Sequence, residues 1–120
     1  MSHLVQGGCL CGAVRFSGRL PTRDLAVCWC SQCMRQNSGP LISTNQAQDV
    51  TMTGDVATYR ASDHASRGFC AACGSTLFWQ EDGEAPSFAH GALDDRSGFR
   101  IVRFLHVDGR PDAYDIEANP

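Results

Sequence analysis

The seven cysteines constrain the fold of this 120-residue chain more than any other feature of its sequence. They form three tight groups: Cys9 and Cys11; Cys28, Cys30 and Cys33; Cys70 and Cys73. Spacings this short let one backbone turn aim two thiolates at a single ion, with zinc–sulfur distances of about 2.3 Å. Gly12 and Gly74 follow the outer groups, where glycine lets the chain turn back so that N–H groups face sulfur. The pattern therefore predicts metal binding.

The N-terminus and the overall charge predict the compartment and the kind of partner. No basic start followed by an apolar segment indicates a signal peptide, and no apolar run approaches the ~20 residues of a membrane helix. We therefore expect a cytoplasmic protein without membrane contact. In that reducing compartment clustered cysteines are metal ligands or catalysts, and their odd number argues against a disulfide framework. A net charge of −3 gives no indication of nucleic-acid binding.

The hydrophobic pattern predicts an all-β fold. Val14 and Phe16 alternate with Arg15, as expected for a half-buried strand, and β-branched and aromatic residues are concentrated in several other short runs. The predicted strands are 12–18, 25–30, 41–44, 50–53, 56–61, 75–80 and 99–107. Two helical turns are expected, one capped by Ser31 and running to Gln36, and one at 63–66. Without repeats or a linker, residues 1–120 are expected to form one domain.

Spacing alone leaves more than one assignment of the cysteines open. They could be buried residues that act as small hydrophobes, although random burial does not place seven thiols in three tight groups. They could also form a single zinc ribbon from the Cys30–Cys33 and Cys70–Cys73 pairs, which leaves three thiols unused. A partition into four and three uses every cysteine. Four thiolates make a closed structural site, whereas three leave a position for water or substrate, as catalytic zinc requires.

Several stretches of the chain resemble the glutathione-dependent formaldehyde-activating enzyme (GFA) family. The similar segments are 7–16 (GGCLCGAVRF), 28–33 (CWCSQC), 66–79 (SRGFCAACGSTLFW), 91–95 (GALDD) and 112–116 (DAYDI). They keep the order of the family and span nearly the whole chain. The resemblance implies a small zinc-containing β-sandwich of complex topology, similar to methionine sulfoxide reductase B.

The resemblance also implies a role for each group of cysteines. Two zinc ions per chain are expected, the second of them partly occupied. The residues implied for the structural zinc are Cys9, Cys11, Cys70 and Cys73. Those implied for the catalytic zinc, and for catalysis itself, are Cys28, Cys30 and Cys33. The implied activity is that of a carbon–sulfur lyase on a thiol–aldehyde adduct, with glutathione and formaldehyde as the family's substrates.

Three further residues are candidates for substrate binding. Trp29 lies between two predicted ligands and would wall the substrate pocket, or else pack in the core like Trp79. Arg35 and Arg67 lie near cysteines in the sequence, as does Arg15. They either offset the negative charge of the thiolates or hold a substrate carboxylate through the bidentate fork of arginine.

Other polar residues are expected to have structural roles. His3, His64, His90 and His106 lack the spacing of zinc ligands, although any of them could complete a zinc shell. The Asp94–Asp95 pair is expected to form a turn.

Two competing functions belong to other classes. A non-catalytic zinc-stabilised binding module would close the second site with a fourth protein ligand. An enzyme like methionine sulfoxide reductase would need a free nucleophilic cysteine, which the partition into four and three does not leave.

Overall fold

The computed structural model describes residues 2–119, and strands are its main regular structure. The strands are β1 (His3–Gly8), β2 (Arg15–Leu20), β3 (Asp24–Cys28), β4 (Leu41–Gln46), β5 (Gln48–Thr53), β6 (Val56–Arg60), β7 (Ala65–Cys70), β8 (Thr76–Glu81), β9 (Ser87–Ala89) and β10 (Arg100–Leu105). The helical segments are α1 (Ser31–Asn37) and the 3₁₀ turns η1 (His90–Ala92) and η2 (Val107–Gly109). The predicted all-β class is confirmed.

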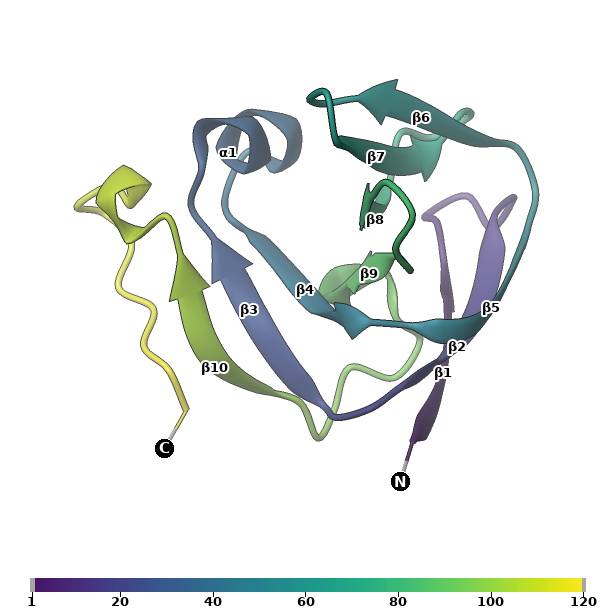
Figure 1. The fold of residues 1–120 in the computed structure, drawn as a ribbon, viewed down its shortest axis with the longest axis horizontal. Helices are drawn as coiled ribbons and strands as arrows, with labels where there is room; N and C mark the ends of the chain where they lie inside the picture. The colour runs from purple at the N-terminus through teal and green to yellow at the C-terminus, as the bar shows by residue number, and fades with distance from the viewer. Residues whose placement is uncertain (1, 120) are drawn as a thin grey trace.

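The strands form two sheets that together make a β-sandwich. The smaller sheet has the order β1-β2-β5, and the larger has the order β10-β3-β4-β9-β8-β7-β6. In Figure 1 the larger sheet curves from β10 and β3 on the left to β6 at the top, while β1, β2 and β5 lie on the right. Neighbouring strands are antiparallel except β10 and β3, which are parallel.

The core lies between the two sheets. Phe16 of β2 stacks on Phe88 of β9 with ring centroids 4.2 Å apart, and both rings are buried. The chain crosses between the sheets at Ala47, which is fully buried between β4 and β5. A β-carbon on Gly18 would lie 3.1 Å from the Phe88 ring, so glycine at this position lets the ring approach the strand closely.

Two local predictions need correction. The helical turn expected at 63–66 is wrong, because Ser66 and Arg67 pair with both neighbouring strands as part of β7. The other predicted turn is found as α1, but its N-cap is Cys30 and not Ser31. The Cys30 sulfur accepts a hydrogen bond from the backbone N–H of Cys33 and so takes the place of the usual oxygen.

The sequence pattern also missed β1 and β9 as well as β7. Gly7 and Gly8 lower the strand propensity of β1. Yet a β-carbon on Gly7 would lie 2.5 Å from the Phe16 ring, so tight packing requires glycine in this strand. The helical segments of residues 2–119 are short, and none of them is long and apolar enough to cross a membrane.

Replacement of Gly68 by alanine is expected to destabilise the protein by about 1–3 kcal/mol, the usual cost of overpacking a core. A β-carbon at this position would lie 2.2 Å from two ring carbons of Phe78, and both residues are buried. Urea unfolding followed by circular dichroism measures the effect. Gly91→Ala is the control, because nothing lies within 4 Å of its β-carbon position. Equal unfolding midpoints for the two variants would contradict the prediction.

Candidate metal centres

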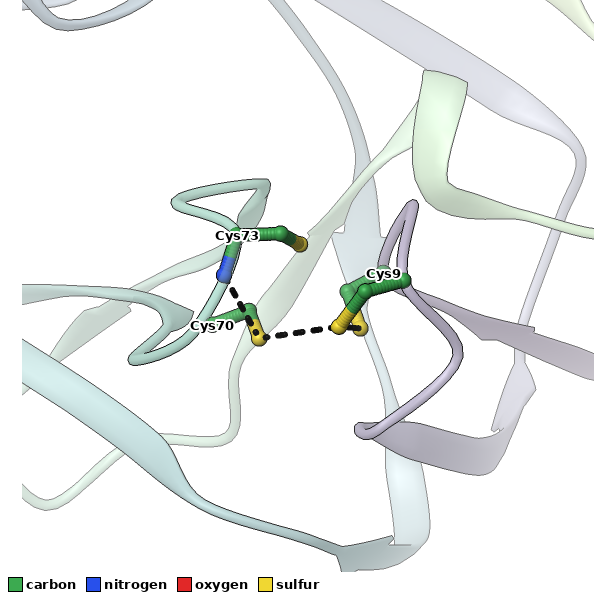
Figure 2. A group of neighbouring side chains, drawn as sticks. Cys9, Cys70 and Cys73 are labelled. Atoms are coloured by element: carbon green, nitrogen blue, oxygen red, sulfur yellow. Dashed lines mark hydrogen bonds between the residues drawn. The ribbon is translucent and has the colours of Figure 1, made fainter.

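Four cysteines from two distant parts of the chain meet at one end of the sandwich. Cys9 and Cys11 lie in the loop after β1, and Cys70 and Cys73 lie at the end of β7 and in the turn that follows. The four sulfur atoms lie within 4.8 Å of one another. Figure 2 shows Cys9, Cys70 and Cys73 facing a common centre. We call these residues the four-thiol group.

Tight turns around the four-thiol group direct backbone N–H groups toward its sulfur atoms. Gly12 and Gly74 have φ angles of 82° and 78°, which an L side chain rarely adopts, and each donates its N–H to the carbonyl of the cysteine that opens the turn. The Cys70 sulfur accepts a hydrogen bond from the N–H of Cys73 at 3.4 Å (Figure 2). The Cys9 sulfur accepts one from a backbone N–H at 3.2 Å.

Ser75 joins the two loops of the four-thiol group, a role that the sequence analysis missed. Its Oγ accepts a hydrogen bond from the backbone N–H of Leu10 at 3.0 Å and lies 3.2 Å from the Cys73 sulfur. The only signal in the sequence is its place directly after the last cysteine group and its glycine.

Contacts within the four-thiol group shift its pKa values in opposite directions. Hydrogen bonds from Ser75 lower the pKa of Cys73 to about 5. The backbone N–H of Ala13 lowers the pKa of Cys11, but contacts with Cys9 and Cys73 outweigh it and raise that pKa to about 11. The metal-free group therefore combines thiols with thiolate, and binding of an ion to all four sulfurs would release protons.

The other three cysteines come from one short segment. Cys28 ends β3, Cys30 caps α1, and Cys33 lies in the first turn of α1 with 2% of its surface exposed. Their sulfur atoms also lie within 4.8 Å of one another. Within residues 2–119 no histidine, aspartate, glutamate or further cysteine joins them. We call these residues the three-thiol group.

The pKa values of Cys28 and Cys33 in the three-thiol group shift in opposite directions. The hydrogen bond from Cys33 lowers the pKa of Cys28. The same contact, followed by burial, raises the pKa of Cys33, against the opposing effect of the nearby Arg67 guanidinium. In the metal-free protein Cys28 is thus the more acidic of these two thiols.

All three thiols of this group line a cavity of about 830 Å³. Its walls also include Gln32, Arg67 and Arg103, as well as His64 and His106. None of the described residues that line it is acidic. The cavity is large enough for a molecule of the size of a small peptide, and its charged walls favour an anion.

Trp29 does not line this cavity. Its side chain is fully buried, and its ring lies 5.2 Å from that of Tyr114 and 6.0 Å from the guanidinium carbon of Arg110. Its indole N–H has no hydrogen-bond partner among the described residues. The Trp29 ring thus packs against Tyr114 and Arg110 of the C-terminal segment and not in the cavity that its two neighbouring cysteines line.

The two candidate arginines lie in different environments. Arg67 is 4% exposed and donates to the Cys33 sulfur at 3.3 Å, whereas Arg35 is exposed on α1 and lines a neighbouring hollow. Arg15 forms a bidentate ion pair with Asp94, which explains the lowered pKa of that carboxyl.

The described histidines belong to neither cysteine group, although His64 and His106 line the same cavity as the three-thiol group. His90 contacts the carbonyl of Arg96 at 3.0 Å, and His64 lies 3.1 Å from a carboxylate oxygen of Asp63. No histidine of the described chain joins either group of thiols.

The donor sets of both groups fit zinc. All the grouped ligand atoms are sulfur, and short loops direct backbone N–H groups at three of them. Closely spaced cysteine thiolates with such N–H donors are typical of zinc sites in proteins. The four-thiol group has enough ligands for a closed tetrahedron. The three-thiol group has one ligand fewer and lies at a cavity wall.

Fold and sites together define a small β-sandwich protein with one four-cysteine and one three-cysteine candidate metal centre. The family model described as glutathione-dependent formaldehyde-activating enzyme matches residues 4–107, a range that includes all seven cysteines. The chain therefore belongs to this family, whose description is that of an enzyme.

Two curated relatives and one solved structure agree with this assignment. An uncharacterized lyase of Schizosaccharomyces pombe is 31% identical, with 92% of this chain and 84% of that protein covered. A protein of Halomonas elongata, provisionally named as a glutathione-dependent formaldehyde-activating enzyme, is 29% identical, with 96% and 82% covered. A crystal structure of a Rhodobacter sphaeroides protein matches with a TM-score of 0.66 at 23% identity, covering 83% of this chain and 99% of the other, and shares the fold.

Tyr114→Ala is expected to shift tryptophan emission to longer wavelength, because it uncovers the buried Trp29 ring. Loss of the aromatic contact and its buried area should lower the free energy of unfolding by about 1–2 kcal/mol. Fluorescence and urea unfolding measure both effects. Tyr59→Ala is the control, since that tyrosine is 65% exposed. Identical emission spectra for the two variants would rule out this role of Tyr114.

Proposed function

We propose that this protein is a zinc-dependent enzyme of the lyase type that makes and breaks the bond between a thiol sulfur and an aldehyde carbon. One observation carries the proposal: three sulfur atoms converge at the wall of an 830 Å³ cavity, and no fourth ligand from residues 2–119 joins them. A site with three protein ligands keeps a position for substrate.

The two candidate centres have different roles in this proposal. The four-thiol group holds a structural zinc, because it has a full set of ligands and lies away from the large cavity. The three-thiol group holds the second zinc, with fewer ligands and therefore with partial occupancy. All seven cysteines are free thiols in the structure, which agrees with a reducing compartment such as the cytoplasm.

The reaction requires no redox change. The thiol sulfur forms a bond to the carbonyl carbon of the aldehyde, and the thiol proton ends on the new hydroxyl oxygen; the reverse reaction breaks that bond. Zinc supplies Lewis acidity that lowers the pKa of a thiol. The three cysteines would hold this ion at the cavity wall, where a substrate thiol could reach it.

The charge of the cavity favours an anionic thiol such as glutathione. Arg67 and Arg103 line it, and no acidic residue of the described chain does so. The names of the family and of the Halomonas relative agree with glutathione and formaldehyde as the substrate pair. Closure of the second centre by a fourth protein ligand would instead favour a non-catalytic zinc module.

Cys70→Ser and Cys30→Ser are expected to affect folding very differently. Cys70→Ser removes a ligand from the group that joins two sheets, so the variant should lose one zinc and unfold in large part, because zinc binding energy is folding energy. Cys30→Ser should lose the other zinc yet remain folded, since serine also caps a helix well. Elemental analysis and circular dichroism measure the two effects.

Retention of both ions by a folded Cys70→Ser variant would contradict the structural role. Unfolding of both variants to the same extent would contradict the division of roles between the two groups.

Exchange between a thiol–formaldehyde mixture and its adduct tests the activity directly. The adduct forms spontaneously, so two-dimensional exchange NMR at equilibrium is the suitable measurement. The wild-type protein should accelerate exchange of glutathione with formaldehyde, and Cys30→Ser should reduce the acceleration at least a hundredfold, as loss of a catalytic metal does. No acceleration by wild-type protein with two zinc ions would refute this substrate pair, and other thiols and aldehydes would then be tested in the same way.

A further inference from the structure

Arg67 is a buried cation that has no acidic partner among residues 2–119. It lies in the middle of β7 and is 4% exposed. Its Nη1 donates to Gln36 at 2.9 Å, and its Nη2 faces Gln32 at 3.4 Å and the Cys33 sulfur at 3.3 Å. Its Nε is buried and has no partner among the described residues.

A buried guanidinium requires a nearby negative charge, because the loss of hydration is not offset by neutral amides alone. None of the salt bridges between described residues includes Arg67. They are Arg15–Asp94, Arg19–Asp49, Arg60–Asp82 and His64–Asp63. The Cys33 sulfur is the one contact of Arg67 that can carry a full negative charge. The position of Arg67 is therefore electrostatically favourable when the three-thiol group is a set of thiolates.

We propose that Arg67 determines which ligand the open position of the three-thiol group accepts, by favouring an anionic thiolate over a neutral ligand. The inference rests on the proposed function, since it assumes a divalent ion held by three thiolates. Such a site has a net charge of −1, and a fourth thiolate makes it −2. The guanidinium beside Cys33 offsets one of these charges, which matters most when the incoming ligand is charged.

The same contacts argue against Arg67 as a clamp for a substrate carboxylate. Both terminal nitrogens already donate to side chains of α1, and the remaining nitrogen is out of reach of solvent. Arg67 is therefore a specificity-determining residue that acts through Cys33. This role distinguishes it from Arg35, which is exposed on α1 and does not line the cavity of the three thiols.

The test compares a charged and a neutral ligand on cobalt-substituted full-length protein. Cobalt replaces zinc at both centres and reports ligand exchange through its visible absorption bands. Titration with 2-mercaptoethanol measures thiolate binding, and titration with imidazole measures binding of a neutral ligand. Arg67→Met removes the charge, Arg67→Lys keeps it, and Arg35→Met removes a charge from the exposed face of α1.

We expect Arg67→Met to weaken binding of 2-mercaptoethanol roughly ten- to a hundredfold, as the loss of one charge near a partly buried site predicts. Imidazole affinity should change less than about threefold, since a neutral ligand adds no charge. Arg67→Lys should keep most of the preference for thiolate, and Arg35→Met should behave as wild type.

Equal weakening of both ligands in Arg67→Met would overturn the inference, because it indicates a merely structural role for Arg67 in holding α1. So would unchanged binding of both ligands. If Arg67→Met does not fold, the double variant Gln32→Ala/Gln36→Ala gives an independent test. It removes the neutral partners and leaves the cation, so it should retain the preference for thiolate, and loss of that preference would overturn the inference.

Failure of the proposed function has a different signature. A wild-type spectrum that responds to neither ligand, with cobalt bound at both centres, would contradict an open position and with it the inference. If the wild-type spectrum responds to both ligands and the Arg67 variants respond in the same way, the inference about Arg67 is contradicted but the proposed function is not.

Discussion

The two sheets of the sandwich meet at four sulfur atoms. Cys9 and Cys11 follow β1 of the smaller sheet, Cys70 ends β7 of the larger sheet, and Cys73 lies in the turn that follows, so the four-thiol group lies where the two sheets meet. The Cys11 and Cys70 sulfurs lie 3.8 Å apart across 59 residues of chain. The entropy cost of closing such a long loop grows only with the logarithm of its length, so the zinc ion proposed above would constrain both sheets at modest cost. Small domains depend on such constraints because their cores are limited.

The three-thiol group is built on a different principle. Its members lie within six residues, and their geometry is set by the end of β3 and the first turn of α1. No distant strand supplies a ligand from the described chain. In the proposed function, a site of this kind exchanges a ligand, or loses its ion, without separating the sheets. The fold thus separates a group that lies between two sheets from a group that faces a cavity, although both consist of the same side chain.

The sequence pattern predicted the fold class and the three closely spaced sets of cysteines because both depend on local patterns, whereas the union of the first and last sets at one centre was implied by the family resemblance. Alternation marks strands such as β2, and short spacing brings thiols together whatever the rest of the fold does. Other features depend on residues far apart in the chain. The burial of Arg67 results from packing of β7 against α1, and Trp29 lies against Tyr114 because η2 and the following residues return to β3. The helical turn expected at 63–66 failed for the same reason, since pairing with two neighbouring strands overrides local propensity.

The packing of Tyr114 on Trp29 has a consequence for the order in which the chain folds during synthesis. Cys28, Trp29 and Cys30 emerge from the ribosome early, whereas β10, which pairs with β3, and Tyr114, which packs on the indole, emerge much later. Until then Cys28 lacks its parallel strand and the Trp29 indole lacks its aromatic neighbour. Contacts of such long sequence separation also form slowly. The segment that holds the three thiols is therefore among the first parts of the molecule to be made and among the last to gain all of its neighbouring strands.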